Sequence, residues 1–245
     1  MTLRTTVDRT VSADPVAAPV LGILMLDTKF PRIAGDAGNP ATWPFPVRIA
    51  RVPGASPERV VRDGAAGLTD AFVTAGCELA AAGAAGMITT CGFLVLHQHE
   101  LAARLPVPFA SSSLLQLPLL ERALPAGRRP GIVTIDAAAL TPAHLAAAGA
   151  DRSTPVAGVD PAGTFARSIL GDRVTLDVAA AEREVLAAAA ELVARQPEVG
   201  AIVLECANMP PYATAVRARF GLPVYDAVSF GRWFYAGLAP AVFER

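Results

Sequence analysis

Apolar runs of strand length alternate with longer helical patterns along most of the chain. Short continuous apolar runs bounded by turn residues are typical of buried strands. Strands are predicted at 20–27, 47–54, 86–90, 106–111, 131–136, 154–160, 200–206 and 223–228. Strands that alternate with helices predict parallel sheets covered by helices on both faces, which is an α/β fold.

The helix signals fall between these strands. Ser56 is a favourable N-cap and Pro57 suits a first helical position, so we predict a long helix from there to about Ala82. Asp177 is expected to cap a second strongly amphipathic helix, 177–196. Further helices are predicted from Gly92 to Leu105, at 113–124 with a break at Pro118, at 142–148, at 211–220 and at the end of the chain.

The chain contains nearly the same pattern twice. Residues 22–28 (GILMLDT) match 131–137 (GIVTIDA), and residues 105–111 match 222–228. Between these anchors, GMITTC and AIVLEC each form an apolar run that ends in cysteine, at Cys91 and Cys206. The matching positions lie 109, 115 and 117 residues apart. A duplicated α/β unit with small insertions explains this agreement.

The duplication predicts the domain organisation. We expect an N-terminal extension over residues 1–18, a first half over 19–127 and a second half over 128–245. The halves are expected to be Rossmann-like or flavodoxin-like and related by a pseudo-twofold axis, with the chain crossing back between them near its C-terminus. Ligands bind beyond the carboxyl ends of parallel strands. The two cysteines should therefore meet across one cleft that forms the active site.

Composition and charge limit the classes of partner and site that the sequence predicts. The 245 residues are 53% hydrophobic and carry a net charge of −1, so nothing favours nucleic acid or an anionic membrane as partner. The first 20 residues lack a signal-peptide core, so we expect a cytoplasmic protein. Three scattered cysteines fit reduced thiols and no metal site. The sequence leaves the oligomeric state open, and a homodimer or higher homo-oligomer would be ordinary for an enzyme of this size.

Two facing thiols indicate proton transfer. A thiol at a strand end, before a helix, lies near backbone N–H groups and the helix dipole, both of which lower its pKa. One thiolate can remove a proton from a carbon while the other thiol protonates the opposite face. The sequence contains no Walker loop or GxGxxG, and this chemistry requires no cofactor. The expected substrate is a small carboxylate.

The duplicated pattern and the residues around both cysteines resemble a known family. The duplicated halves, TTCGF (89–93) and ECANMPPY (205–212) are similar to the aspartate/glutamate/hydantoin racemase superfamily, over about residues 20–240. The loop GDAGNPATWPF (35–45) resembles the family's substrate-covering loop. The resemblance implies a cofactor-independent racemase or epimerase with Cys91 and Cys206 as its two acid/base residues. It further implies that Asn39, Thr42, Thr90, Gly92, Ser112 and Asn208 surround the substrate.

Three departures leave the substrate open. Gly92 and Phe93 follow the first cysteine, where aspartate and glutamate racemases have Asn-Thr. The second cysteine lacks the Thr-His that follows it in glutamate racemases, and Asp27-Thr28 replaces Asp-Ser-Gly. The substrate could therefore be aspartate, glutamate, a hydantoin or another small acid.

Other classes of protein share parts of this pattern. Arylmalonate decarboxylases have one working cysteine, and maleate isomerases use a cysteine as a nucleophile. A two-lobed binding protein needs no thiols, and a redox protein would form a Cys91–Cys206 disulfide.

Asp27, Glu205 and Cys77 each have a functional and a structural interpretation. Asp27 could orient a thiol or bind a substrate amine, or simply cap a loop. Glu205 precedes Cys206, and strand alternation directs it to the other face. It could pair with an arginine, or act at the cleft if the strand has already turned, but a structural role is favoured. Cys77 has no counterpart in the other half and belongs to the helix core by this interpretation.

Overall fold

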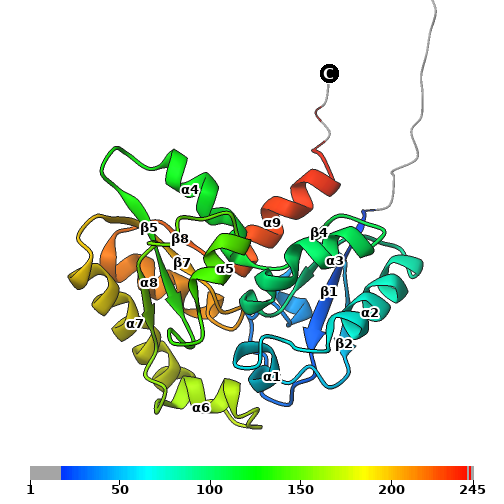
Figure 1. Cartoon of the computed structure of the whole chain (residues 1–245), viewed down its shortest axis with the longest axis horizontal. Helices are drawn as coiled ribbons and strands as arrows, with labels where there is room; N and C mark the ends of the chain where they lie inside the picture. Colours follow the sequence, from blue (N-terminus) through cyan, green and yellow to red (C-terminus); the bar gives the residue numbers. More distant parts are fainter. Residues whose placement is uncertain (1–17, 242, 244–245) are drawn as a thin grey trace, which may run out of the picture.

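Two four-stranded parallel sheets form the framework of the molecule. A computed structural model describes residues 18–241 and 243; the predicted extension, 1–18, lies outside this range except for Ala18. The sheet orders are β2-β1-β3-β4 and β6-β5-β7-β8, with every pairing parallel. Figure 1 shows the two sheets in separate lobes. The α/β fold with two parallel-sheet halves is therefore confirmed.

The eight observed strands fall at the eight predicted places. In the first sheet they are β1 (Val20–Leu26), β2 (Val47–Val52), β3 (Ala84–Thr89) and β4 (Phe109–Ala110). In the second they are β5 (Arg129–Thr134), β6 (Val156–Gly158), β7 (Val199–Leu204) and β8 (Val224–Tyr225). The β1–β3 and β5–β7 pairs each show a register shift near the strand start. This shared irregularity extends the duplication from sequence to backbone.

Helices cover both sheets. The first half contains α1 (Pro57–Val61), α2 (Thr69–Ala81), α3 (Gln98–Arg104) and α4 (Leu117–Ala123). The second contains α5 (Pro142–Ala147), α6 (Thr164–Leu170), α7 (Val178–Arg195), α8 (Ala213–Phe220) and α9 (Ala227–Leu238). Helix α2 packs against β1, β2 and β3, and α7 packs against β5, β6 and β7. These two long helices occupy equivalent places in the duplication.

The prediction of one continuous helix from Ser56 to Ala82 is wrong, because the chain forms two separate helices there. Ser56 caps α1 as expected, but the helix ends at Val61 and α2 starts only at Thr69. Gly64 and Gly67 adopt positive φ angles of 59° and 71° between the two helices. Glycine reaches this left-handed region at little cost, and so the chain turns there. Helical periodicity concealed the break because alanine and glycine surround it.

The last helix of each half packs against the sheet of the other half. The chain leaves β4 through α4, which packs against β5 of the second sheet. At the other end, α9 leaves β8 and packs against β3 of the first sheet, and in Figure 1 it lies between the lobes. Phe45 of the first half stacks on Tyr235 of α9 with ring centroids 3.6 Å apart. The halves are therefore tied together by exchanged helices.

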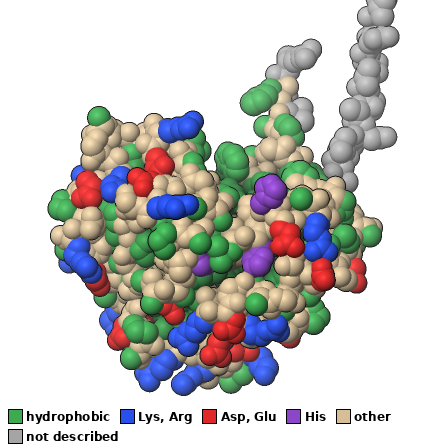
Figure 2. Space-filling model, viewed as in Figure 1, with side chains coloured by type: hydrophobic (Ala, Val, Ile, Leu, Met, Phe, Trp, Pro, Cys, Tyr) green, Lys and Arg blue, Asp and Glu red, His purple; other side chains and the backbone are tan. Residues whose placement is uncertain are grey.

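No helix in the described ranges is long and apolar enough to cross a membrane. Figure 2 shows basic and acidic side chains interspersed over one face of the molecule. This mixture agrees with a net charge of −1.

The docking of α9 depends on Gly231, whose place Ala cannot take without a clash. A Cβ there would lie 2.5 Å from Cη2 of the buried Trp43 ring, whereas a Cβ at Gly237, in the same helix, meets open space. Both Ala variants gain the same helix propensity. We expect Gly231→Ala to lower the free energy of unfolding by about 1–3 kcal/mol, and Gly237→Ala to raise it slightly. Denaturant unfolding of both variants would measure this; equal effects would contradict the packing.

Candidate active site

A narrow cavity lies where β3 and β7 end. Residues from both halves line it, and many of them are apolar. They are Leu26, Phe30, Arg32, Pro57, Val61, Thr90, Cys91, Gly92 and Phe93 from the first half, with Ile135, Ile169, Leu170, Glu205, Cys206 and Asn208 from the second. The parallel sheets thus direct their carboxyl ends toward one shared space, as expected for a ligand site in this class of fold.

Both predicted cysteines line this cavity as free thiols. Cys91 is 8% exposed and Cys206 is 7% exposed. Cys91 lies at the start of a 3-10 helix (Gly92–His97) with its backbone N–H donating to Thr89 Oγ1. The Cys206 thiol donates to Asn208 Oδ1 over 3.4 Å. Two thiols from equivalent strand ends therefore meet in one mostly buried space.

The expectation of lowered thiol pKa values is wrong for this structure. Burial raises the pKa of Cys91 to about 12, and the negative charge of Glu205 adds to the rise. Hydrogen bonds from the backbone of Phe93 and Leu94 lower this pKa, but by less. Burial, followed by Glu205, likewise raises the pKa of Cys206 well above its usual value. Both sulfurs are therefore thiols at neutral pH, and a thiolate must be generated within the closed site.

Glu205 belongs to the cavity, contrary to the interpretation from strand alternation. Strand β7 ends at Leu204, so the alternation no longer holds at Glu205. The side chain is 1% exposed and its Oε2 accepts a hydrogen bond of 2.9 Å from Thr134 Oγ1. Burial raises the pKa of Glu205 to about 7, against the lowering effect of Thr134. A carboxyl group that titrates near neutral pH thus lies close to both thiols.

The duplication makes Glu205 the counterpart of Thr90. Each residue directly precedes a cysteine, and each backbone N–H donates to the matching neighbour strand, Thr90 to Leu24 O and Glu205 to Val133 O. Thr90 uses its hydroxyl to accept from Leu26 N over 3.2 Å. The two halves therefore share a backbone plan, but only the second places a carboxyl group at this position.

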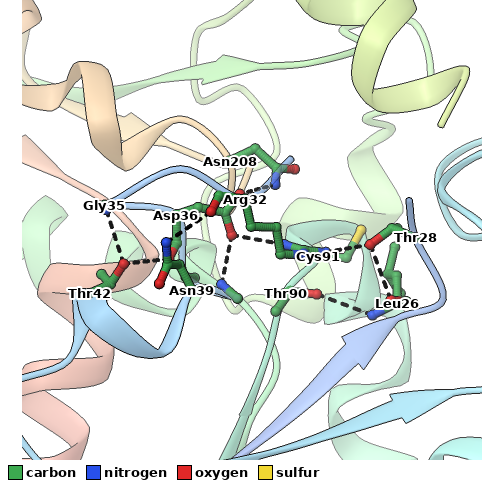
Figure 3. A network of polar contacts seen from close by, with 12 residues as sticks. Leu26, Thr28, Arg32, Gly35, Asp36, Asn39, Thr42, Thr90, Cys91 and Asn208 are labelled. Atoms are coloured by element: carbon green, nitrogen blue, oxygen red, sulfur yellow. Dashed lines mark hydrogen bonds and ion pairs between the residues drawn. The ribbon is translucent and has the colours of Figure 1, made fainter. Parts of the chain in front are cut away.

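A charged network connects the first-half loop to Asn208 of the second half (Figure 3). Arg32 contacts Asp36 over 2.8 Å through Nη1 and Thr28 Oγ1 over 3.1 Å through Nη2. Asp36 in turn accepts from Asn208 Nδ2, beside Cys206. The Arg32 side chain is 10% exposed, and its buried Nε has no partner in the described part of the chain. Arg32 thus brings a positive charge into a mostly apolar cavity.

The structure brings some of the other predicted residues to the cavity and leaves the rest outside it. Thr90, Gly92 and Asn208 line the cavity with the cysteines. Asn39 and Thr42 lie outside it and fix the loop, because Asn39 Nδ2 donates to Arg32 O and Thr42 Oγ1 donates to Asp36 O.

Ser112 and Asp27 are placed differently. Ser112 accepts from Leu114 N and lines a second cavity that Glu205 also borders. Asp27 is exposed, and the structure does not bring it to the thiols.

Arg32 and Glu205 are the residues that sequence reasoning missed. Arg32 lies in a loop without periodicity, and its contacts with Asp36, Thr28 and the Phe30 ring hold the side chain in place. Glu205 carried a usable signal, because aligning the two halves places a charged residue against Thr90 inside an apolar run. A charge at such a position is costly unless the site uses it.

Known protein families and curated proteins resemble this chain. The family described as Asp/Glu/Hydantoin racemase matches residues 50–234. A dimethylsulfoniopropionate lyase of Durusdinium sp. clade D is 29% identical over 228 residues, covering 89% of this chain and 74% of that protein. Further relatives at 24% to 30% identity are dimethylsulfoniopropionate lyases of Emiliania huxleyi, and the chain spans 44% to 73% of their lengths.

Solved structures share the fold at lower identity. Allantoin racemase from Pseudomonas fluorescens has a TM-score of 0.61 and 18% identity, covering 89% of this chain and 90% of that one. Arylmalonate decarboxylase has a TM-score of 0.60 and 16% identity, covering 92% and 95%. Racemases and a decarboxylase thus share the two-sheet architecture described above.

The raised pKa of Glu205 predicts how stability changes with pH. The folded protein favours the protonated carboxyl, so this contribution is complete below the ordinary pKa of 4.5 and is lost as the pH rises through about 7. The rise corresponds to about 3 kcal/mol. We expect Glu205→Gln to gain stability relative to wild type between about pH 5 and 8. Unfolding free energies of both proteins at each pH would test this, and parallel curves would contradict it.

Proposed function

Because the chain belongs to the Asp/Glu/hydantoin racemase family, we propose that it is a cofactor-independent enzyme that moves a proton at the carbon next to a carboxylate. Cys91 and Cys206 are the acid and base in this proposal. One observation carries it: two thiols from equivalent strand ends line the same buried cavity. Such a pair can remove and deliver protons on two sides of one carbon.

Arg32 supplies the binding group that this chemistry requires. Its buried Nε donor has no partner among the described residues, and the side chain lines the cavity with both thiols. A guanidinium group suits a carboxylate because it offers several donors in a fixed plane. The charge of Arg32 also lowers the pKa of Cys91. A carboxylate held there places its α-carbon within a cavity that excludes water, where the electrostatic effect of the cation is strong.

The first candidate reaction is β-elimination from a sulfonium carboxylate of the dimethylsulfoniopropionate type. The curated relatives favour it, since their identity to this chain exceeds that of the racemases among the solved structures. A thiolate takes the α-proton, the C–H electrons form a C=C bond, and the C–S bond breaks. Dimethyl sulfide leaves with that bond's electron pair, which gives acrylate. The aromatic ring of Phe93 in the cavity wall suits a methylated cation.

The second candidate is racemisation or epimerisation of an amino-acid-like acid or a hydantoin. The presence of a thiol from each half favours it, because inversion needs a base on one face and an acid on the other. The first step, proton removal beside a carboxylate or carbonyl, is common to both candidates. They differ in whether the carbanion is reprotonated or expels a leaving group.

Proton NMR in D₂O separates the two candidates. The panel contains dimethylsulfoniopropionate, aspartate, glutamate, a 5-substituted hydantoin, an arylmalonate and maleate. Elimination would produce acrylate, and racemisation would exchange the α-proton with inversion. We expect Cys91→Ser and Cys206→Ser each to lower the turnover rate at least about 100-fold, because a hydroxyl is a far weaker acid and base here.

Cys77 provides the matched control. It is an exposed free thiol on α2 and not part of the helix core, so that interpretation of the sequence is wrong. Cys77→Ser should therefore keep the wild-type rate. A covalent adduct in the intact mass would instead indicate a thiol nucleophile of the maleate isomerase kind. Binding of a panel member without turnover, retained in both Cys→Ser variants, would contradict the enzyme proposal and favour a binding protein.

The role of Arg32 predicts a change in substrate binding. Arg32→Lys retains the positive charge but loses the planar arrangement of donors. We expect KM for the active substrate to rise by roughly tenfold or more, with a smaller change in kcat. Arg51→Lys is the control, since Arg51 donates to Thr28 O in the same region and does not line the thiol cavity. Equal KM changes in both variants would argue against a carboxylate contact at Arg32.

A further inference from the structure

We propose that the carboxyl group of Glu205 is the proton-exchange partner of both thiols, accepting the proton that a thiol must lose before it acts as a base. This inference rests on the proposed function for its catalytic consequence. The sharing of a proton between the carboxyl group and the thiols can be tested without any substrate.

The position of Glu205 is the first support. Gly92, directly after Cys91, leaves room for it, because a Cβ at Gly92 would overlap Glu205 Oε1 and lie 2.6 Å from Glu205 O. Thr134 holds Oε2, whereas the buried Oε1 has no hydrogen-bond partner among the described residues. One carboxyl oxygen is thus fixed and the other is available beside the first cysteine loop.

Glu205 also lines two cavities. One is the thiol cavity, and the other is a second narrow cavity next to Ser111, Ser112 and Ser113. The buried Ser111 Oγ has no partner within the described ranges. A proton on Glu205 can therefore pass to a space bordered by hydroxyl groups without crossing the substrate.

The charges around Glu205 favour the sharing of a proton between its carboxyl group and the two thiols. No basic side chain in the described part of the chain forms an ion pair with it. The titratable groups that share its cavity are Cys91, Cys206 and the cationic Arg32. The negative charge of Glu205 raises the pKa of both thiols, whereas Arg32 lowers that of Cys91. Two negative charges in this buried space repel each other strongly, whereas one is tolerated. A thiolate is therefore favoured when Glu205 carries the proton.

The step balances as a proton transfer. The S–H bond of a cysteine breaks, an O–H bond forms on Glu205, and the negative charge moves from oxygen to sulfur. The thiolate then takes the substrate α-proton and becomes a thiol again. After elimination, Glu205 releases its proton toward the serine-lined cavity. After racemisation, it returns the proton to the thiol that protonated the substrate carbon. Either step restores the starting charges. Thr90, the counterpart of Glu205, cannot accept a proton in this way, so the relay exists in one half only.

Glu205→Gln tests the inference because it keeps the shape and an acceptor for Thr134 but cannot take a proton. The ultraviolet absorbance of thiolate, followed during a pH titration in a Cys77→Ser background, reports the two buried cysteines. We expect more thiolate in Glu205→Gln than in wild type at pH 9, by at least roughly tenfold, the effect of a pKa lower by about one. The exposed Glu191, substituted by Gln, is the control for general loss of charge and should leave the titration unchanged.

Kinetics test the relay itself. Despite having more thiolate at equilibrium, Glu205→Gln should lose roughly 100-fold in kcat with KM unchanged. The wild-type rate should rise as the pH passes about 7, where Glu205 ionises, and this rise should be absent in Glu205→Gln. Thr134→Val removes the hydrogen bond that lowers the Glu205 pKa, and should shift the rise to higher pH.

The outcomes separate the two proposals. An unchanged thiolate titration in Glu205→Gln overturns the inference, whatever the activity. A raised KM with unchanged kcat also overturns it and assigns Glu205 to binding the substrate cation. A shifted titration in a protein that turns over no substrate supports proton sharing while refuting the proposed function.

Discussion

Three acidic groups buried in one small space constrain this site. Cys91, Cys206 and Glu205 each lose hydration on folding, so each favours its neutral form. Any negative charge placed on one of them raises the cost of charging the others. The resting protein therefore keeps its thiols protonated, and reactivity depends on how the site moves a single negative charge. This differs from thiols activated at an exposed helix N-terminus, which are ionised before a substrate arrives.

Arg32 supplies the positive charge that counters negative charge in this cavity. Asp36 neutralises part of the arginine charge and at the same time holds Asn208, whose carbonyl oxygen accepts from the Cys206 thiol. One loop of the first half therefore orients a side chain beside the cysteine of the second half. The backbone adds a further link, because Ala37 N donates to Ala207 O. Movement of this loop would change the surroundings of both thiols together.

The sequence predicted the framework well and the electrostatics poorly, for physical reasons. The eight strands and both cysteines could be located because buried parallel strands are continuous apolar runs and the duplication repeats them. The break at Gly64 and Gly67 was hidden by alanine, which fits a helix and a turn region equally in a periodicity analysis. The thiol pKa values depend on burial by distant segments, and Arg32 on the fold of an irregular loop. Neither follows from local pattern.

The exchanged helices also determine the order in which the protein can be completed during synthesis. Helix α9 covers β3 and packs around Trp43 and Phe45, which are synthesised long before it. One apolar face of the first sheet therefore lacks its native cover while the whole second half up to α9 is being synthesised.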